Sequence, residues 1–189
     1  MTIRMYGWIG AHSAGKTTTV NRVHRFLVED GRQVIKIPEV ARLYPGKIGK
    51  NGGFSAQLWM IQEQMRLEME AVAEFKEIEI SESSVNTFPV AYEQEVKYIL
   101  CDRTIWDMLA YSISLNRREL ISDTELQIIK TTVLGWDGVK TPYDTVFFCE
   151  KKPLYDDGVR DTDPAWQDDI HQTFKTMIKE YDIKVVTVQ

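Results

Sequence analysis

Residues Gly10-Ala11-His12-Ser13-Ala14-Gly15-Lys16-Thr17 decide the fold of this chain. They match the pattern G-x-x-x-x-G-K-[ST], in which successive backbone N–H groups curl around phosphate oxygens. The stretch follows an apolar segment, Ile3–Ile9, and precedes a helical pattern from about Lys16 to Glu29. A strand before the loop and a helix after it are the context that this motif requires. The sequence therefore predicts a nucleoside triphosphate site at this loop.

The residues of the loop have distinct expected roles. The glycines let the backbone bend, and the first turn of the following helix adds the positive end of its dipole. Lys16 is expected to reach the β- and γ-phosphates, and the Thr17 hydroxyl to bind Mg²⁺. His12 receives no chemical role beyond its place in the loop. The predicted nucleotide-binding set is Gly10, His12, Ser13, Ala14, Gly15, Lys16, Thr17 and Thr18.

Strand-like and helical segments alternate along the rest of the chain. Apolar runs predict further strands at 33–37, 97–101, 144–149 and 183–188, and helical patterns run over about 55 into the seventies, 104–116, 123–136 and 164–181. Residues 81–95 have no clear pattern. Strands that alternate with helices predict a parallel sheet covered on both faces. We therefore expect one α/β domain over residues 1–189, with three layers and five strands.

One helical pattern is long enough to define a buried face. Leu58, Ile61, Met65, Met69 and Val72 recur at steps of three and four residues. This spacing places them on one side of a helix and marks its apolar face.

Composition excludes several classes of protein. The chain has 189 residues and a formal net charge of −5, so it has no basic excess with which to neutralise a nucleic acid backbone. No run approaches membrane-spanning length and no signal peptide is apparent, so a cytoplasmic protein without a membrane segment is expected. Cys101 and Cys149 end two apolar runs and are expected to be buried and reduced.

Charged residues follow the other predicted strands. Glu39 follows the second strand, the pair Asp102-Arg103 follows the third, and Arg160 lies in a polar loop, about 151–163, after the fourth. Ligands of doubly wound sheets bind outside the carboxyl ends of the strands. Asp102 is placed to hold magnesium or its waters, and Arg103 is placed to stabilise phosphoryl charge. Glu39 is a candidate weak base for an acceptor hydroxyl.

Each of these charges also has a purely structural interpretation. Asp102 stands just before Thr104 and could cap the next helix. Glu39 and Arg42 could be surface charges, and Arg160 could pair with the acids of its own loop. The sequence does not choose between these interpretations.

At these residues the chain resembles the P-loop nucleoside and nucleotide kinases, which include thymidylate kinase, the deoxynucleoside kinases and ribosylnicotinamide kinase-like ATPases. Gly10–Thr17 is similar to the phosphate loop of that superfamily, and Pro38-Glu39 with Arg42 is similar to its acidic motif after strand two. Asp102-Arg103 resembles the pair that contacts magnesium and the acceptor. These segments, with Asp107, Tyr111 and Tyr143-Asp144, look closest to the ribosylnicotinamide kinase-like branch.

The resemblance implies a strand order of 2-3-1-4-5 and a lid at about 151–163 that closes Arg160 onto the phosphates. It also implies that Gln57 reads the base of an acceptor, with Gln62 as a weaker candidate; a solvated helix face is the alternative for both. The lid has one clear arginine, whereas many relatives have several. No residue set identifies the base of the acceptor.

The resemblance implies transfer of a phosphoryl group from ATP with Mg²⁺ to a small acceptor. The proposed catalytic set is Lys16, Glu39, Asp102, Arg103 and Arg160, with Glu39, Arg42, Gln57 and Arg103 on the acceptor and Thr17 and Asp102 on the metal. Arg42 and Arg103 together favour a (deoxy)nucleoside monophosphate slightly over a nucleoside. Ribosylnicotinamide is a third choice.

A regulatory P-loop ATPase without a small-molecule acceptor is the competing class. A GTP switch would normally carry an Asn-Lys-x-Asp segment, and none occurs in the sequence. Trp8 and Trp59 could face a second copy in a homodimer, although packing in the core is the expected fate of both.

Overall fold

The computed structural model describes residues 2–83, 96–139, 143–154 and 162–189, and side chains in 78–83 and 138–139 are not described. Its strands are β1 (Thr2–Ile9), β2 (Val34–Ile37), β3 (Val96–Asp102), β4 (Thr145–Cys149) and β5 (Val185–Val188). Its helices are α1 (Lys16–Glu29), α2 (Gly53–Ser83), α3 (Ile105–Arg117), α4 (Asp123–Val139) and α5 (Pro164–Glu180), with short 3₁₀ turns η1 (Val40–Arg42) and η2 (Gly49–Asn51).

The strands form one five-stranded parallel sheet in the order β2-β3-β1-β4-β5, which confirms the expected order. Trp8 on β1 is paired with Asp102 on β3 and with Phe147 on β4. The carboxyl ends of these three strands therefore meet at one edge of the sheet. The phosphate loop, Asp102-Arg103 and the residues after Cys149 all start from this edge.

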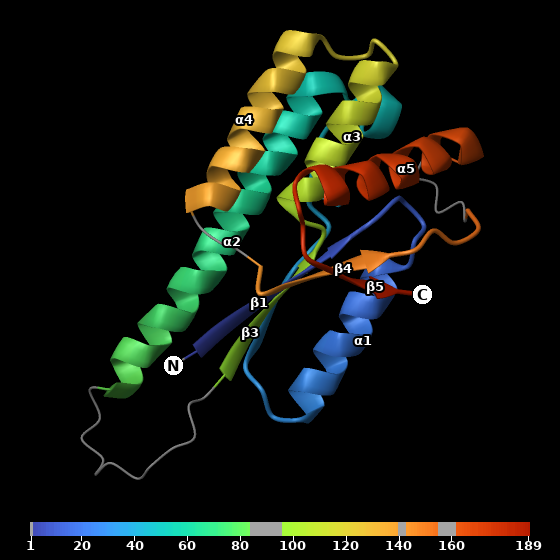
Figure 1. Cartoon of the computed structure of the whole chain (residues 1–189). Helices are drawn as coiled ribbons and strands as arrows, with labels where there is room; N and C mark the ends of the chain where they lie inside the picture. Colours follow the sequence, from blue (N-terminus) through green and yellow to red (C-terminus); the bar gives the residue numbers. More distant parts are fainter. Residues whose placement is uncertain (1, 84–95, 140–142, 155–161) are drawn as a thin grey trace.

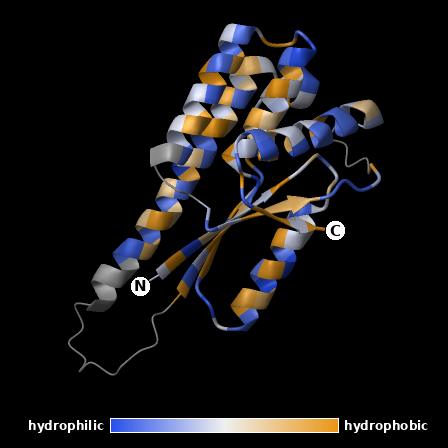
Figure 2. Cartoon of the chain, viewed as in Figure 1, coloured by the Kyte–Doolittle hydropathy of each residue, from blue (hydrophilic) through white to orange (hydrophobic). Residues whose placement is uncertain are grey.

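Helices cover both faces of the sheet, which confirms the three-layer α/β fold (Figure 1). Helix α1 packs on one face over a cluster that contains Trp8, Val20 and Leu100. Helices α2, α3 and α5 lie on the other face, and α4 packs outside α2 and α3. The strands carry largely apolar residues, and the helices alternate polar and apolar residues (Figure 2). Cys101 and Cys149 are buried free thiols, as expected.

The buried face of α2 differs from the predicted one. Met69 is 49% exposed, whereas the fully or almost fully buried positions of the helix include Gln57, Gln64 and Glu68. A pattern built on apolar residues missed this face because polar side chains occupy three of its positions. Helix α2 thus buries amides and a carboxylate between the sheet and its neighbours, and such groups need hydrogen-bond partners or a ligand.

The helix that follows β3 begins in a way that matters for the site. Thr104 caps α3, because its hydroxyl accepts a hydrogen bond from Trp106 N (3.2 Å) while the Asp107 carboxylate accepts one from Thr104 N (3.0 Å). Asp102 is therefore not the cap of this helix. The next helix is capped by Ser122, whose hydroxyl accepts a hydrogen bond from Glu125 N (3.3 Å) while the Glu125 carboxylate accepts one from Ser122 N (2.7 Å).

Candidate active site

The phosphate loop takes backbone conformations that favour glycine at both ends of the motif. Gly10 has φ 140° and Gly15 has φ 84°. A Cβ on Gly10 would lie 2.7 Å from the carbonyl oxygen of Cys149, so the loop and the end of β4 are in close contact. Gly15 begins α1 without a side-chain hydrogen bond to the first turn. The N–H groups at this helix start are therefore available to an anion.

The Lys16 side chain is folded into the loop. Its ammonium donates hydrogen bonds to the carbonyls of Gly10 (2.6 Å) and Ala11 (2.8 Å), and only 5% of the residue is exposed. Burial, followed by the charge of Arg103, lowers the pKa of Lys16 to about 8. The negative charges of Asp107, Glu39 and Asp102 act to raise the pKa of Lys16. The lysine therefore interacts electrostatically with groups at the ends of the neighbouring strands.

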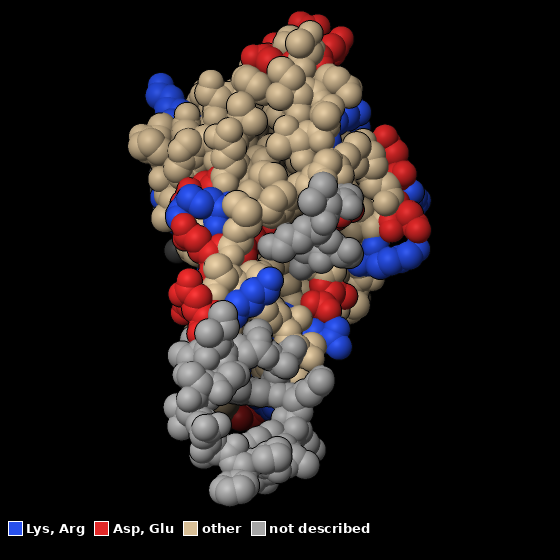
Figure 3. All heavy atoms as spheres, turned by 90° about the vertical axis from the view of Figure 1, so that its left-hand side faces the viewer, with Lys and Arg blue, Asp and Glu red and all other residues tan. Residues whose placement is uncertain are grey.

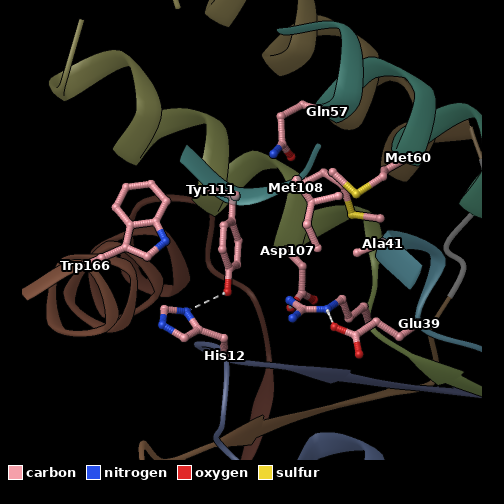
Figure 4. Close-up of a pocket in the computed structure, with 12 residues that line it drawn as sticks. His12, Glu39, Ala41, Gln57, Met60, Asp107, Met108, Tyr111 and Trp166 are labelled. Carbon is pink, nitrogen blue, oxygen red and sulfur yellow. Dashed lines mark hydrogen bonds and ion pairs between the residues drawn. The ribbon is translucent and has the colours of Figure 1, made fainter. Parts of the chain in front are cut away.

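The other loop residues differ in their exposure to solvent. Ala14 is buried, Thr17 is half-buried and Thr18 is exposed. The Ser13 hydroxyl is buried and has no hydrogen-bond partner among the described residues. His12 turns away from the phosphate side, because its Nδ1 lies 3.2 Å from the Tyr111 hydroxyl in the neighbouring pocket (Figure 4).

Asp102 is suited to a magnesium site. The residue is 4% exposed, and its Oδ1 is buried without a hydrogen-bond partner among the described residues. Mg²⁺ is bound in triphosphate sites by one or two protein oxygens, while waters and phosphates complete its shell. The Asp102 carboxylate and the Thr17 hydroxyl fit this requirement. Within the described residues, no group of three or more His, Cys, Asp or Glu forms a metal site of its own.

Glu39, Arg103 and Asp107 form a buried ionic cluster next to the loop. Arg103 Nε donates to Glu39 Oε1 (2.8 Å), and Arg103 Nη1 lies 3.1 Å from Asp107 Oδ1. All three residues are at most 7% exposed. Burial raises the pKa of Asp107, while the carboxylates hold the pKa of Arg103 well above its usual value. The guanidinium is therefore fixed in place by two carboxylates.

The backbone of Arg103 is held in an unusual conformation. Its φ is 102°, which is strained for a residue with a side chain. Gln64 Nε2 on α2 donates to the Arg103 carbonyl (3.3 Å) and to Glu68 Oε1 (2.9 Å). Glu68 also accepts hydrogen bonds from the Tyr143 hydroxyl (2.5 Å) and Trp136 Nε1 (3.3 Å). The polar face of α2 thus supports the turn that aims Arg103.

A pocket opens between the ionic cluster and α2 (Figure 4). Its empty volume is about 600 Å³, open solvent included. Glu39 and Asp107, which both pair with Arg103, lie toward the sheet edge, while aromatic and sulfur-containing side chains line other parts of the pocket. The lining consists of His12, Glu39, Ala41, Ile48, Gly49, Gln57, Met60, Arg103, Asp107, Met108, Tyr111 and Trp166.

Gln57 points into this pocket from α2 (Figure 4). It is 2% exposed, and its Oε1 is buried without a hydrogen-bond partner among the described residues. A buried amide oxygen without a partner costs free energy unless a ligand satisfies it. Gln62, the weaker candidate, is exposed to solvent.

The remaining predicted residues lie at the margin. Arg42 Nε pairs with Glu39 Oε2 (3.0 Å), and the Arg42 side chain is 44% exposed. Arg160 and most of the predicted lid lie outside the described residues. Lys50, which follows the lining residue Gly49, forms an ion pair with Asp163 (2.6 Å), and its ammonium lies 5.7 Å from the ring centre of the lining residue Trp166.

Sequence reasoning assigned no role to several lining residues. Three of them lie on different helices and come together only in the fold: Met60 on α2, Met108 on α3 and Trp166 on α5. For Asp107 the sequence indicates a structural role, because Thr104 and Asp107 have the spacing of a capping box. That signal explains one oxygen of Asp107, whereas the other pairs with Arg103.

The surface carries charges of both signs. On the face in Figure 3, acids gather at the very top, the broad region below them carries few charges, and acids and basic residues lie beside one another lower down and at the right side. Among the described helices, none is long and apolar enough to cross a membrane.

Comparisons with known proteins agree with this architecture. A family model described as an AAA domain matches residues 8–189. A solved structure of deoxyadenosine kinase from M. mycoides with bound dATP has a similar fold, with a TM-score of 0.60, 14% identity, and coverage of 98% of this chain and 90% of that chain. Another, with the products dCMP and a flexible dCDP bound, has a TM-score of 0.57 at 13% identity with the same coverage.

Among curated proteins, no sequence relative reaches the level of a match. The family model spans nearly the whole chain, and the strand order and phosphate loop agree with the structural likeness. The chain therefore belongs to this family of AAA domains, within the P-loop NTPase superfamily.

Proposed function

We propose that this chain transfers the γ-phosphoryl group of ATP to a hydroxyl of an acceptor that carries no phosphate, most simply a nucleoside. The phosphate loop would hold the triphosphate, and the pocket between Gln57 and Glu39 would hold the acceptor. The donor half (the phosphate loop) and the acceptor half (the pocket) of this site both begin at one edge of the sheet. The pKa of Lys16 in the loop is shifted by the charges of Glu39, Arg103 and Asp107 in the pocket. A donor and an acceptor bound there would face each other.

The charged groups of the pocket are the reason to prefer an acceptor without a phosphate. The Arg103 guanidinium is buried and shared between Glu39 and Asp107, and Arg42 also contacts Glu39. A phosphate on the acceptor would have to compete with two carboxylates for these arginines, and would itself approach buried negative charge. The geometry therefore favours a nucleoside over the monophosphate that the arginines suggested in the sequence. Ribosylnicotinamide also lacks a phosphate and satisfies the same condition.

The proposed reaction uses few protein groups. The acceptor hydroxyl oxygen would attack the γ-phosphorus while the bond from this phosphorus to the β–γ bridging oxygen breaks and ADP leaves. Glu39, a buried carboxylate in the lining of the acceptor pocket, would orient the hydroxyl and receive its proton. Lys16 and Arg103 would stabilise the charge on the migrating group. Thr17 and Asp102 would hold Mg²⁺, which neutralises phosphate charge when bound.

An acceptor panel tests this proposal. ADP formation from Mg²⁺·ATP would be measured with nucleosides, deoxynucleosides, their monophosphates and ribosylnicotinamide. We expect a phosphate-free member to stimulate turnover more than its own monophosphate does. Stronger stimulation by a monophosphate would contradict the charge argument. Turnover that no member changes would instead favour a regulatory ATPase.

A pair of variants assigns any stimulation to the pocket. Glu39→Gln should remove the acceptor-dependent part and retain ATP binding. Glu63→Gln is the matched control, because Glu63 pairs with Arg66 on the outer side of α2. Equal turnover in both variants would remove Glu39 from the mechanism.

A further inference from the structure

Lys152 lies over the phosphate loop, although it is separated from the loop by most of the chain. A Cβ placed on Gly15 would be 3.4 Å from the Lys152 Nζ and 3.7 Å from its Cδ and Cε. The side chain therefore runs along the residue that begins α1. Gly15 is also where the N–H groups of the first helical turn have no side-chain cap. The ammonium is thus close to the part of the loop that binds anions in this motif.

The backbone of Lys152 is attached to the loop. Gln167 on α5 is 4% exposed, and its Nε2 donates to the Lys152 carbonyl (3.0 Å) and to the His12 carbonyl (2.9 Å). One buried amide thus joins the segment after β4 to the phosphate loop. The contact between Gly10 and the Cys149 carbonyl fixes the same two segments a few residues earlier. A lysine mounted in this way loses little further backbone freedom when it binds a ligand.

The neighbouring lysine serves as a contrast. Lys151 pairs with Asp168 on α5, and its side chain is 46% exposed. The two lysines are adjacent in sequence and have the same charge. Only Lys152 approaches Gly15.

Positive charge gathers around the loop. Burial raises the pKa of Cys149 to about 11, the charges of Lys16 and Lys152 act to lower it, and those of Asp107 and Asp102 act to raise it. Arg103 in turn lowers the pKa of Lys16. Like charges at such range repel, and a bound polyphosphate, with several negative charges, would turn this repulsion into attraction.

We infer that Lys152 is a second phosphate-binding cation, which contacts the phosphate oxygens of the nucleotide together with Lys16. The inference names a residue that the loop motif does not contain. It also adds a cation at the start of the predicted lid, about 151–163, where the sequence has a single clear arginine, Arg160. It rests on the triphosphate half of the proposed function and not on the identity of the acceptor.

Binding measurements without an acceptor test this inference. Calorimetry would compare Mg²⁺·ATP and inorganic triphosphate on the intact chain and on Lys152→Met, Lys152→Arg and Lys151→Met. Loss of one charge-assisted contact predicts about 10- to 100-fold weaker binding of both ligands by Lys152→Met. Lys152→Arg should recover most of the affinity, and Lys151→Met should match the intact chain. Equal affinity in Lys152→Met and the intact chain would overturn the inference.

Lysine footprinting on the protein without substitutions tests the inference even if a Lys152 variant fails to fold. Lysines would be acetylated under limiting reagent, with and without Mg²⁺·ATP, and the modified sites quantified by mass spectrometry. Protection of Lys152 but not Lys151 supports the inference, and no protection of Lys152 contradicts it. The proposed function fails separately, if Mg²⁺·ATP binds in a Lys152-dependent way but no acceptor changes turnover.

Discussion

The phosphate loop and the acceptor pocket lie at the same sheet edge but are built in different ways. The loop comes from eight consecutive residues, and its ligand contacts are expected mainly from backbone N–H groups. The pocket is lined by side chains from the loop, η1, η2, α2, α3 and α5. A contiguous site of backbone groups tolerates sequence change around its glycines and lysine. A dispersed site of side chains can be altered one residue at a time, so it is the half in which specificity resides.

The largest expected effect falls on the loop. Lys16→Ala removes the ammonium that is buried against the loop carbonyls, and we expect turnover to fall by about 10³-fold or more, because a charge-stabilising group is lost. Steady-state kinetics with Mg²⁺·ATP measures this loss. Lys36→Ala is a matched control, since Lys36 is exposed and its ammonium donates a hydrogen bond to Asn21 Oδ1 on α1 (2.8 Å). A Lys16→Ala protein with undiminished turnover would show that the loop is not the donor site.

The second effect separates the two halves. Glu39→Gln should lower kcat with an acceptor by about 10²- to 10⁴-fold, the range for a lost general base. ATP affinity should change by less than about threefold, because Glu39 lies in the pocket and not in the loop. Calorimetry measures the affinity for ATP, and steady-state kinetics with the acceptor measures kcat. If ATP affinity fell as far as kcat, the two halves would not be separable.

The third effect concerns the Gln57 amide. Gln57→Leu should raise the KM for the acceptor by about 10- to 100-fold, because the ligand group that binds the Gln57 amide would be buried without a hydrogen bond. The empty variant should be as stable as the original or more so, since the change removes a buried oxygen without a described partner. Gln62→Leu, at an exposed position of the same helix, is the control. A destabilised variant with an unchanged KM would assign Gln57 to structure alone.

The smallest effect is a pH dependence of the loop. Burial lowers the pKa of free Lys16 to about 8, and a bound triphosphate should raise it. ATP affinity is then constant below this pKa and falls by up to about tenfold per pH unit above it, because binding takes up a proton. Calorimetry from pH 7 to pH 9.5, in two buffers of different ionisation enthalpy, measures both the affinity and the proton uptake. A flat affinity across that range would contradict the buried state of Lys16.

The fold was predictable from the sequence because its signals are local. The loop motif fixed the start of the sheet, and apolar runs located every strand to within a few residues. The strand order followed from the resemblance and is confirmed. The buried face of α2 was mispredicted, because Gln64 and Glu68 are buried through partners, Arg103, Tyr143 and Trp136, that are distant in sequence.

The site was predictable only in part, for the same reason. Glu39, Asp102, Arg103 and Gln57 were chosen from strand ends and resemblance, and the structure places the first three after strands β2 and β3 and Gln57 on α2, pointing into the same pocket as Glu39 and Arg103. The ion pairing within this group could not be predicted from the sequence, since it includes Asp107, whose Oδ1 lies 3.1 Å from Arg103 Nη1. Lys152 gave no signal at all, because its place over Gly15 depends on the parallel order of β1 and β4.

Transfer of label from [γ-³²P]ATP tests most directly whether the two halves form one site. The protein would be incubated with the label, Mg²⁺ and the best acceptor of the panel, and the products separated by chromatography. The account predicts that label appears on the acceptor, in proportion to ADP, and that Glu39→Gln abolishes it. Label found only in inorganic phosphate, at a rate independent of the acceptor, would contradict it.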